Sequence, residues 1–170
     1  LNAGANEAFG ASGTTFPMND GSINLNGYSQ TLAAVTGSTA SSVQGGTGLT
    51  SVLTLGSGNT SSTFVGALSG NLALVKIGTG TLTLSGSVTM TGVITVQEGT
   101  LDLSAATLSA GTRINTAKLA TVKLPTASIS KLYVDNVKLS PGRWGAPGSV
   151  AASLADFESP AFSGPGVVTI

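Results

Sequence analysis

Residues 78–86 read GTGTLTLSG, and nearly the same phrase returns as GTLDLS at residues 99–104. In both copies, leucine alternates with a polar residue after a glycine. Such alternation over a short run is typical of a β-strand with one buried and one solvated face. The second copy begins 19 residues after Gly80. We therefore expect Leu82 to pack against Leu101, one turn of the chain further on.

The same pattern of two apolar residues around a central residue recurs along the chain. It is found at residues 23–25, 53–55, 72–74, 82–84, 94–96, 101–103, 122–124, 132–134, 137–139 and 168–170. Gly, Asn, Ser or Pro separates most of these runs, as expected for tight corners. The spacings from Leu53 to Leu72 and from Leu82 to Leu101 are both 19 residues. Recurrence near 20 residues is typical of a solenoid, and about eight such coils would form a rod of roughly 40 Å.

Composition limits the classes of protein to which the chain can belong. Its 170 residues suffice for one domain with a sizeable core. Seven basic residues balance seven acidic ones and only 8% of the residues are charged, so nucleic acid is excluded as a partner. Cysteine and histidine are absent. This removes disulfides, thiolate zinc sites, the commonest general base and the commonest metal ligand. No apolar run approaches the roughly 18–20 residues of a membrane-spanning helix.

The charged residues are unevenly distributed. Residues 1–112 contain one cation, Lys76, whereas residues 113–143 contain Arg113, Lys118, Lys123, Lys131, Lys138 and Arg143 against Asp135 alone. The sequence therefore predicts a solenoid with one basic and one mildly acidic end. These charges can serve as a solvated face that keeps sheet edges apart. Complementary ends, or an anionic polysaccharide partner, are the alternatives.

A search for catalytic and ligand-binding groups yields no site. The carboxylate pairs Glu98/Asp102 and Asp156/Glu158 are better interpreted as solvated side chains at corners and wet faces. Residues 45–48, GGTG, begin like a calcium-binding roll but contain no aspartate. Asn59 begins a glycosylation acceptor of a kind that arises easily in a chain rich in Ser and Thr. We predict no catalytic, cofactor-binding or metal-binding residue, and expect the protein not to be an enzyme.

Three further segments allow a functional and a structural interpretation. The pairs Thr81/Thr83 and Thr89/Thr91 are similar to the threonine ladders of ice-binding solenoids, but Asp102 and Lys123 are expected to interrupt the first ladder. Trp144 could stack on a sugar, although a cap residue over the last coil is the better interpretation. Residues 149–157, SVAASLADF, are the one stretch that could form two helical turns.

Residues 53–106 resemble the autotransporter-associated β-strand repeat. The glycine turn with its TLTLSG strand is Gly80–Gly86, the short arm is Val88–Gly92, and the closing T-V-x-x-G-T-L is Thr95–Leu101. Residues 22–38 are similar to the segment that often precedes such repeats. Residues 142–145 and 162–167 resemble the way in which many such bacterial surface proteins end. The resemblance implies a right-handed parallel β-helix that is exported and displayed at the bacterial surface, and it brings no catalytic residues with it.

Taken together, the sequence predicts one all-β domain, a right-handed parallel β-helix. Residues 1–21 form an N-terminal cap, residues 22–140 the coils, and residues 141–170 a C-terminal cap with the last strand. The leading functional hypothesis is a non-catalytic structural subunit of an extracellular fibre or surface stalk, assembled by head-to-tail stacking of identical chains. The alternatives are a passenger fragment of an adhesin and a polysaccharide-binding β-helix. Further copies of the chain are thus the main expected partner, and a surface polysaccharide is the other.

Overall fold

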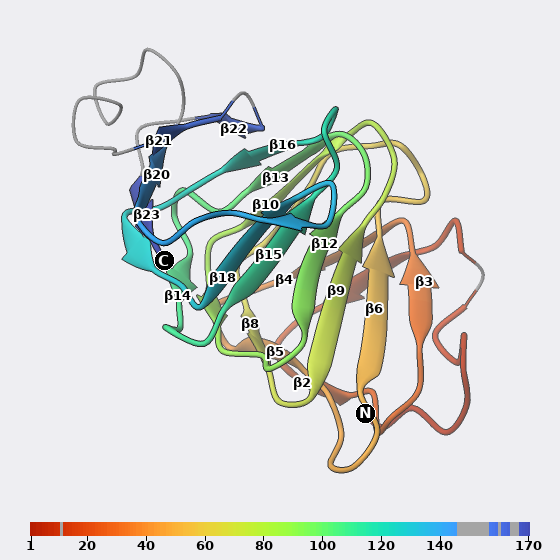
Figure 1. Cartoon of the computed structure of the whole chain (residues 1–170). Coiled ribbons are helices and arrows are strands. Elements are labelled where there is room, and N and C mark those ends of the chain that lie inside the picture. The colour runs from red at the N-terminus through yellow and green to blue at the C-terminus, as the bar shows by residue number, and fades with distance from the viewer. Residues whose placement is uncertain (11, 146–156, 160, 164–166) are drawn as a thin grey trace.

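Parallel strands wind into a solenoid (Figure 1). It has about six turns around one apolar core. The computed structural model describes residues 1–10, 12–145, 157–159, 161–163 and 167–170, and these residues contain no helix. The all-β β-helix predicted from the sequence is confirmed, while its right-handedness stays a prediction. Most of the helical candidate at residues 149–157 lies outside the described residues. Its last residue, Phe157, begins a short strand.

The widest sheet, called the wide face below, has seven strands. Its strands are β3 (Gln30–Leu32), β6 (Ser51–Leu55), β9 (Leu72–Lys76), β12 (Val93–Val96), β15 (Arg113–Thr116), β18 (Lys131–Val134) and β19 (Val137–Lys138). All neighbouring pairs are parallel except β18 and β19, which are antiparallel.

Two five-stranded sheets form the other sides. The threonine face consists of β7 (Ser62–Phe64), β10 (Thr81–Leu84), β13 (Thr100–Asp102), β16 (Thr121–Lys123) and β22 (Phe162–Ser163). The short face consists of β2 (Gly21–Asn24), β5 (Ser41–Gln44), β8 (Ala67–Ser69), β11 (Ser87–Val88) and β14 (Thr107–Leu108). From β7 to β15 the chain visits the threonine, short and wide faces in turn, so that three strands make one coil.

The remaining strands lie at the two ends. At the N-terminal end, β1 (Thr15–Met18) pairs with β4 (Ala34–Gly37), and β4 lies beside β7. The C-terminal end is a mixed sheet of β17 (Ala127–Ser128), β23 (Val167–Thr169), β20 (Arg143–Gly145) and β21 (Phe157–Glu158).

The register of the repeated phrase explains why the sequence repeats. Leu82 of β10 pairs with Leu101 of β13, and Thr83 pairs with Asp102, as the 19-residue spacing predicts. Leu101 in turn pairs with Val122 of the next coil. The three apolar side chains are at most 1% exposed. A single coil encloses too little volume to bury such side chains, so each coil depends on the apolar residues above and below it.

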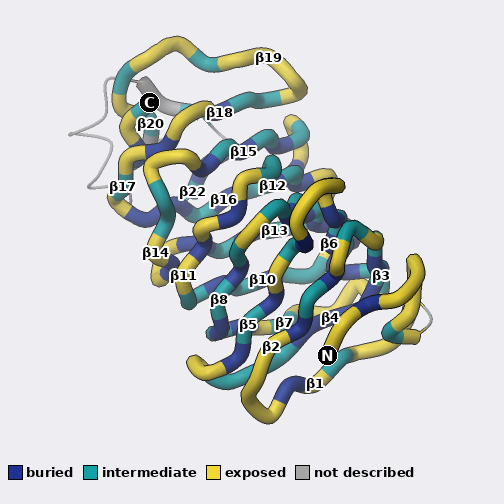
Figure 2. Tube along the Cα trace, turned by 90° about the horizontal axis from the view of Figure 1, so that it is seen from below, coloured by how far each residue is buried: buried dark blue, intermediate teal, exposed yellow. Residues whose placement is uncertain are grey.

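Buried residues are stacked from coil to coil on all three faces (Figure 2). On the wide face, Leu53, Leu74, Ile94, Ile114 and Leu132 occupy the same inward position in successive coils. Each strand of the short face places one apolar side chain inward at the matching position: Ile23, Val43, Leu68, Val88 and Leu108. Continuous columns of this kind stabilise the rod without disulfides.

The step between neighbouring coils varies, and the number of coils in the sequence prediction is wrong. Leu53 pairs with Leu74, 21 residues away, whereas Leu72 lies over Ser51. The coil count is about six and not eight, because the chain leaves the regular path after β18. There β19 turns back antiparallel to β18, and β22 later returns to pair with β16.

Residues 1–10 lie along the outer edges of β2 and β3. The backbones of Leu1 and Ala3 bond to Asn24 of β2, with N···O distances of 2.8 Å in both directions. Under β3, the Glu7 carboxylate accepts hydrogen bonds from the backbone N–H and the hydroxyl of Thr31, at 2.8 and 2.9 Å. The carboxylate takes the place of a strand carbonyl, and the ladder of the wide face stops there.

A buried glutamine holds this N-terminal segment in place. Gln30 is 1% exposed and occupies the inward position that Leu53 has in the next coil. Its amide nitrogen donates to the Ala5 carbonyl at 2.9 Å, and its amide oxygen accepts from the backbone N–H of Phe9 at 3.1 Å. The column of leucines thus ends in a polar side chain whose hydrogen bonds are satisfied by residues 5–9.

Candidate functional site

Asp102, the acid in the repeated phrase, pairs with a base on the next coil. It lies on the outer side of the threonine face, and its carboxylate is 3.2 Å from the Lys123 ammonium. The side-chain and backbone donors of Ser104 also bond to it. Burial alone would raise the pKa of Asp102, but the hydrogen bonds from Ser104 and Lys123 together with the Lys123 charge outweigh it and lower the pKa. The carboxylate is ionised and held by the sheet.

This ion pair leads to a first prediction. The substitution tested is Asp102→Thr, which places at position 102 the residue type of its register partner Thr83. Because the folded-state pKa is lowered, the contribution of Asp102 is fully present above the unfolded value and is lost as the pH falls through the folded one. At pH 7, Asp102→Thr should reduce the free energy of unfolding by about 0.5–1 kcal/mol. Urea titrations should show that this difference shrinks progressively as the pH falls below the usual aspartate value of 3.8. A constant difference at every pH would contradict the assignment.

The other candidates from the sequence do not come together. Glu98 is exposed at the corner before Gly99, whereas Asp102 faces Lys123. Asp156 lies outside the described residues. The Asn59 side chain accepts a hydrogen bond from the backbone N–H of Thr79 at 3.1 Å, which gives it a role in the corner. The Trp144 ring is half-buried against the core, and its indole N–H donates to the Ser140 carbonyl at 3.0 Å.

The pair Thr81/Thr83 forms part of a shallow surface, whereas Thr89 and Thr91 do not line it. Thr83 pairs with Thr63 on one side and with Asp102 on the other, and Asp102 pairs with Lys123. The ladder is therefore interrupted where the sequence predicted. Beside it is a hollow of about 420 Å³ whose lining is mostly hydroxyl side chains from β1, β4, β7 and β10.

One lysine is buried, which the sequence analysis did not anticipate. Lys76 ends β9, is 1% exposed, and stands in register with Leu55 and Val96. Its ammonium donates to the carbonyls of Ile77 and Gly78, both at 2.7 Å, and of Glu98 at 3.2 Å. Burial lowers the pKa of Lys76, and the charge of Glu98 offsets this only in part. Lys76 therefore joins two neighbouring coils at a corner. The signal in the sequence was its position two residues after Leu74, on the inward side of the strand.

Arginine, lysine and tyrosine side chains come together on the outer side of the wide face. Arg113 pairs with Lys131, Asn115 pairs with Tyr133, and Tyr133 pairs with Lys138. A hollow of about 200 Å³ lies among Val93, Arg113, Asn115, Tyr133 and Asn136. The sequence predicted the excess of cations in this part of the chain, but not that it shares one surface with Tyr133. That placement follows from the coil length, which brings β15 and β18 side by side.

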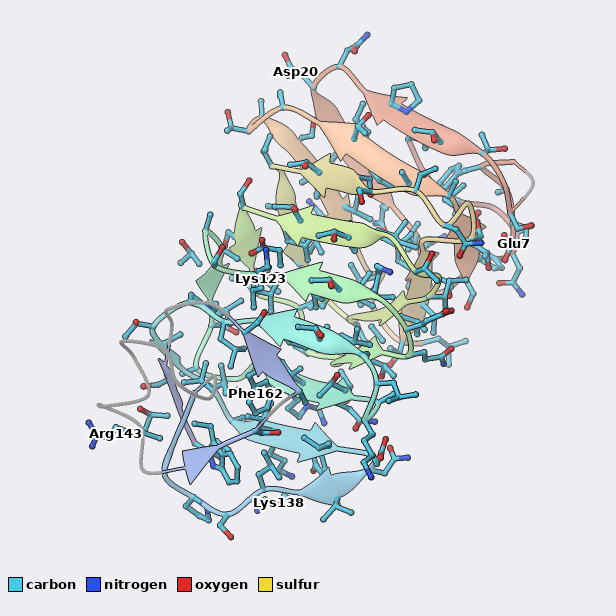
Figure 3. All side chains as sticks on the ribbon, turned by 90° about the horizontal axis from the view of Figure 1, so that it is seen from above. Glu7, Asp20, Lys123, Lys138, Arg143 and Phe162 are labelled. Carbon is cyan, nitrogen blue, oxygen red and sulfur yellow. The ribbon has the colours of Figure 1, made fainter. Side chains whose placement is uncertain are left out.

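The charge separation predicted between the two ends is visible in the structure. Glu7 and Asp20 lie at one end of the solenoid, and Lys138 and Arg143 lie at the other (Figure 3). Among the described residues, no group of three acidic side chains is arranged to hold a metal ion. The same residues include no helix that is long and apolar enough to cross a membrane.

Comparison with known proteins identifies the central coils. A family model described as passenger-associated-transport-repeat matches residues 74–103, from β9 to the end of β13. No curated protein and no solved structure matches the chain. The family match and the β-solenoid fit an autotransporter passenger repeat protein, which confirms the resemblance noted from the sequence. The repeat also suggests a secreted or surface-displayed passenger.

Proposed function

We propose that this autotransporter passenger-type surface protein is a non-catalytic structural rod, which holds other parts of a passenger away from the bacterial cell. The observation that carries the proposal is the continuity of the apolar columns through successive coils. Each coil is bonded to the next on three sides, so the solenoid resists bending and local opening. The matched repeat supports export and display outside the cell.

The position of the N-terminal segment supports the proposal of a rod that does not stack on a second copy through its N-terminal end. An unpaired strand edge is a template for another chain. Here residues 1–10 occupy the edge of β2 with backbone bonds and the edge of β3 with the Glu7 carboxylate. Gln30 fixes the same segment from inside the core.

Head-to-tail assembly into a fibre is the second candidate function. It is favoured by the outer edge of β1, which pairs with β4 on one side and has no partner strand on the other among the described residues. A second copy could add a strand there. Pro17 within β1 is typical of an edge strand that stays unpaired, so we place the fibre second.

The test compares the intact chain, a chain lacking residues 1–10, and Gln30→Leu, by light scattering and negative-stain microscopy. The intact chain should be monomeric. The deletion should self-associate, because it exposes the edges of β2 and β3. Gln30→Leu should self-associate less than the deletion variant, because the backbone hydrogen bonds between residues 1–10 and β2 remain. Circular dichroism verifies that all three chains keep their β-structure.

Filaments of the intact chain that vanish on deletion would overturn the rod and support the fibre with strand exchange. Monomers in all three samples would show that residues 1–10 are not needed to prevent association through the edges of β2 and β3. Enzymatic turnover by the intact chain would contradict the non-catalytic role.

A further inference from the structure

The outward residues of the wide face change character along the axis. One outward row begins with small apolar residues and ends with cations: Val52, Ala73, Val93, Arg113, Lys131. The neighbouring row begins with threonines and ends with an amide and an aromatic ring: Thr31, Thr54, Val75, Thr95, Asn115, Tyr133. The early coils present small apolar and hydroxyl side chains, whereas the last two coils present charged, amide and aromatic side chains that can bind a ligand.

Hydrogen bonds hold the residues around the hollow. The side-chain amide of Asn115 donates to the Asn136 side-chain oxygen at 2.6 Å, and the backbone N–H of Asn136 donates back to the Asn115 oxygen at 3.2 Å. The Arg113 guanidinium donates to the Thr91 carbonyl. A guanidinium has five N–H donors, so this bond fixes the side chain and leaves donors for a ligand. The hollow is therefore organised before anything binds.

The cations of this surface form no ion pair with acidic side chains of the described part of the chain. Among the described residues, no carboxylate lies within 4.0 Å of the charged groups of Arg113, Lys131 or Lys138. The nearby acid Asp135 accepts a hydrogen bond from the backbone N–H of Lys118 at 2.7 Å. A surface with this excess positive charge attracts an anionic partner.

We propose that this surface binds an acidic polysaccharide, with Tyr133 as a platform for a sugar ring and Arg113 and Lys131 as partners of the carboxylates. An aromatic ring offers a flat apolar face to the C–H groups of a sugar, and its hydroxyl offers a polar edge. Arginine binds carboxylate through two parallel hydrogen bonds. The site goes beyond the structural role proposed above, because a rod needs no ligand.

The same observations disfavour the two other anionic partners. Nucleic acid requires a dense basic surface, and this chain has seven basic residues against seven acidic ones. A lipid surface requires exposed apolar side chains that insert between headgroups. The hollow has one aliphatic side chain in its lining, Val93, which is partly buried, and the exposed Val137 beside Lys138 is a single aliphatic side chain, too little to insert between headgroups.

The test measures binding of the intact chain to oligogalacturonate by isothermal titration calorimetry, with its methyl ester as the uncharged probe. The earlier coils supply conservative replacements: Arg113→Val copies Val93, and Tyr133→Thr copies Thr95. Lys123→Ser is the matched control, because it removes one positive charge from the threonine face and copies Ser163 in the same register. Thermal melts verify that each variant is folded.

The acidic oligomer should bind and the ester should not, with an affinity that falls as salt is added. Arg113→Val should weaken binding about tenfold, because it removes a charge-assisted contact. Tyr133→Thr should weaken it about fivefold, and Lys123→Ser should leave it unchanged. Equal binding by all variants, or no binding by the intact chain, would overturn the site. Binding to vesicles of phosphatidylglycerol but not to the oligomer would overturn the polysaccharide in favour of a membrane.

Discussion

Gly78→Ala is expected to reduce the free energy of unfolding by about 2–5 kcal/mol, which combines a backbone penalty of about 1–2 kcal/mol with a steric penalty of about 1–3 kcal/mol. The backbone at Gly78 has φ +71°, in the left-handed region that residues with a Cβ avoid. A Cβ there would also lie 2.2 Å from the Gly56 carbonyl oxygen. That oxygen belongs to the backbone of the adjacent coil, so it cannot move aside as a flexible side chain would.

Two other glycines separate these penalties. Gly48 has φ +101°, and a Cβ added there would meet no atom within 4 Å, so Gly48→Ala isolates the backbone penalty of about 1–2 kcal/mol. Gly111 has no left-handed φ, and its nearest neighbour would be the Ser109 hydroxyl at 3.9 Å. Gly111→Ala should change stability by less than about 0.5 kcal/mol.

Thermal melts measure the series directly. At about 2–4 °C per kcal/mol for a chain of this size, Gly78→Ala should melt roughly 4–20 °C below the intact protein. The order of destabilisation should be Gly78→Ala, then Gly48→Ala, then Gly111→Ala. If Gly78→Ala and Gly48→Ala melt together, the close approach of the two coils contributes nothing.

The sequence predicted the fold where apolar residues alternate. The pair Leu82 and Leu101 gave both the strands and their register, because a wrong register would place the leucines in solvent. In the short face, the sequence predicted only the strand at residues 23–25, which overlaps β2. The other strands of this face place a single apolar side chain inward, such as Val43 or Val88, and a single residue shows no periodicity.

The candidate binding surface could be predicted only in part. The excess of cations after residue 112 is a property of composition and is plain in the sequence. Its alignment with Tyr133 depends on the 18-residue step from Arg113 to Lys131, which is shorter than the 20-residue step before it. Coil lengths vary with corner geometry, so neighbours across coils cannot be assigned from an average repeat.

Lys76→Met is expected to reduce the free energy of unfolding by about 2–3 kcal/mol at pH 7, because charge-assisted hydrogen bonds to buried and partly buried carbonyls are lost. The affected acceptors are the carbonyls of Ile77, Gly78 and Glu98. Methionine fills much of the same volume, so the result reports the ammonium and not a cavity. Lys118→Met is the control, since Lys118 is exposed and its replacement should change stability by less than about 0.5 kcal/mol. An equally stable or more stable Lys76→Met would mean that burying the charge outweighs its hydrogen bonds.

The pH dependence of the same variant tests the buried ammonium independently. Burial lowers the folded-state pKa of Lys76 below its usual value of 10.5. Between the two pKa values the unfolded chain binds more protons than the folded one, so the stability of the intact protein rises with pH in this alkaline window. Lys76→Met lacks this contribution. The difference in unfolding free energy between the two proteins, measured by urea titration, should therefore widen as the pH rises towards 10.5. If the difference in unfolding free energy narrows over this range, the folded-state pKa of Lys76 lies above its usual value. In that case the carbonyl partners stabilise the ammonium more than burial destabilises it.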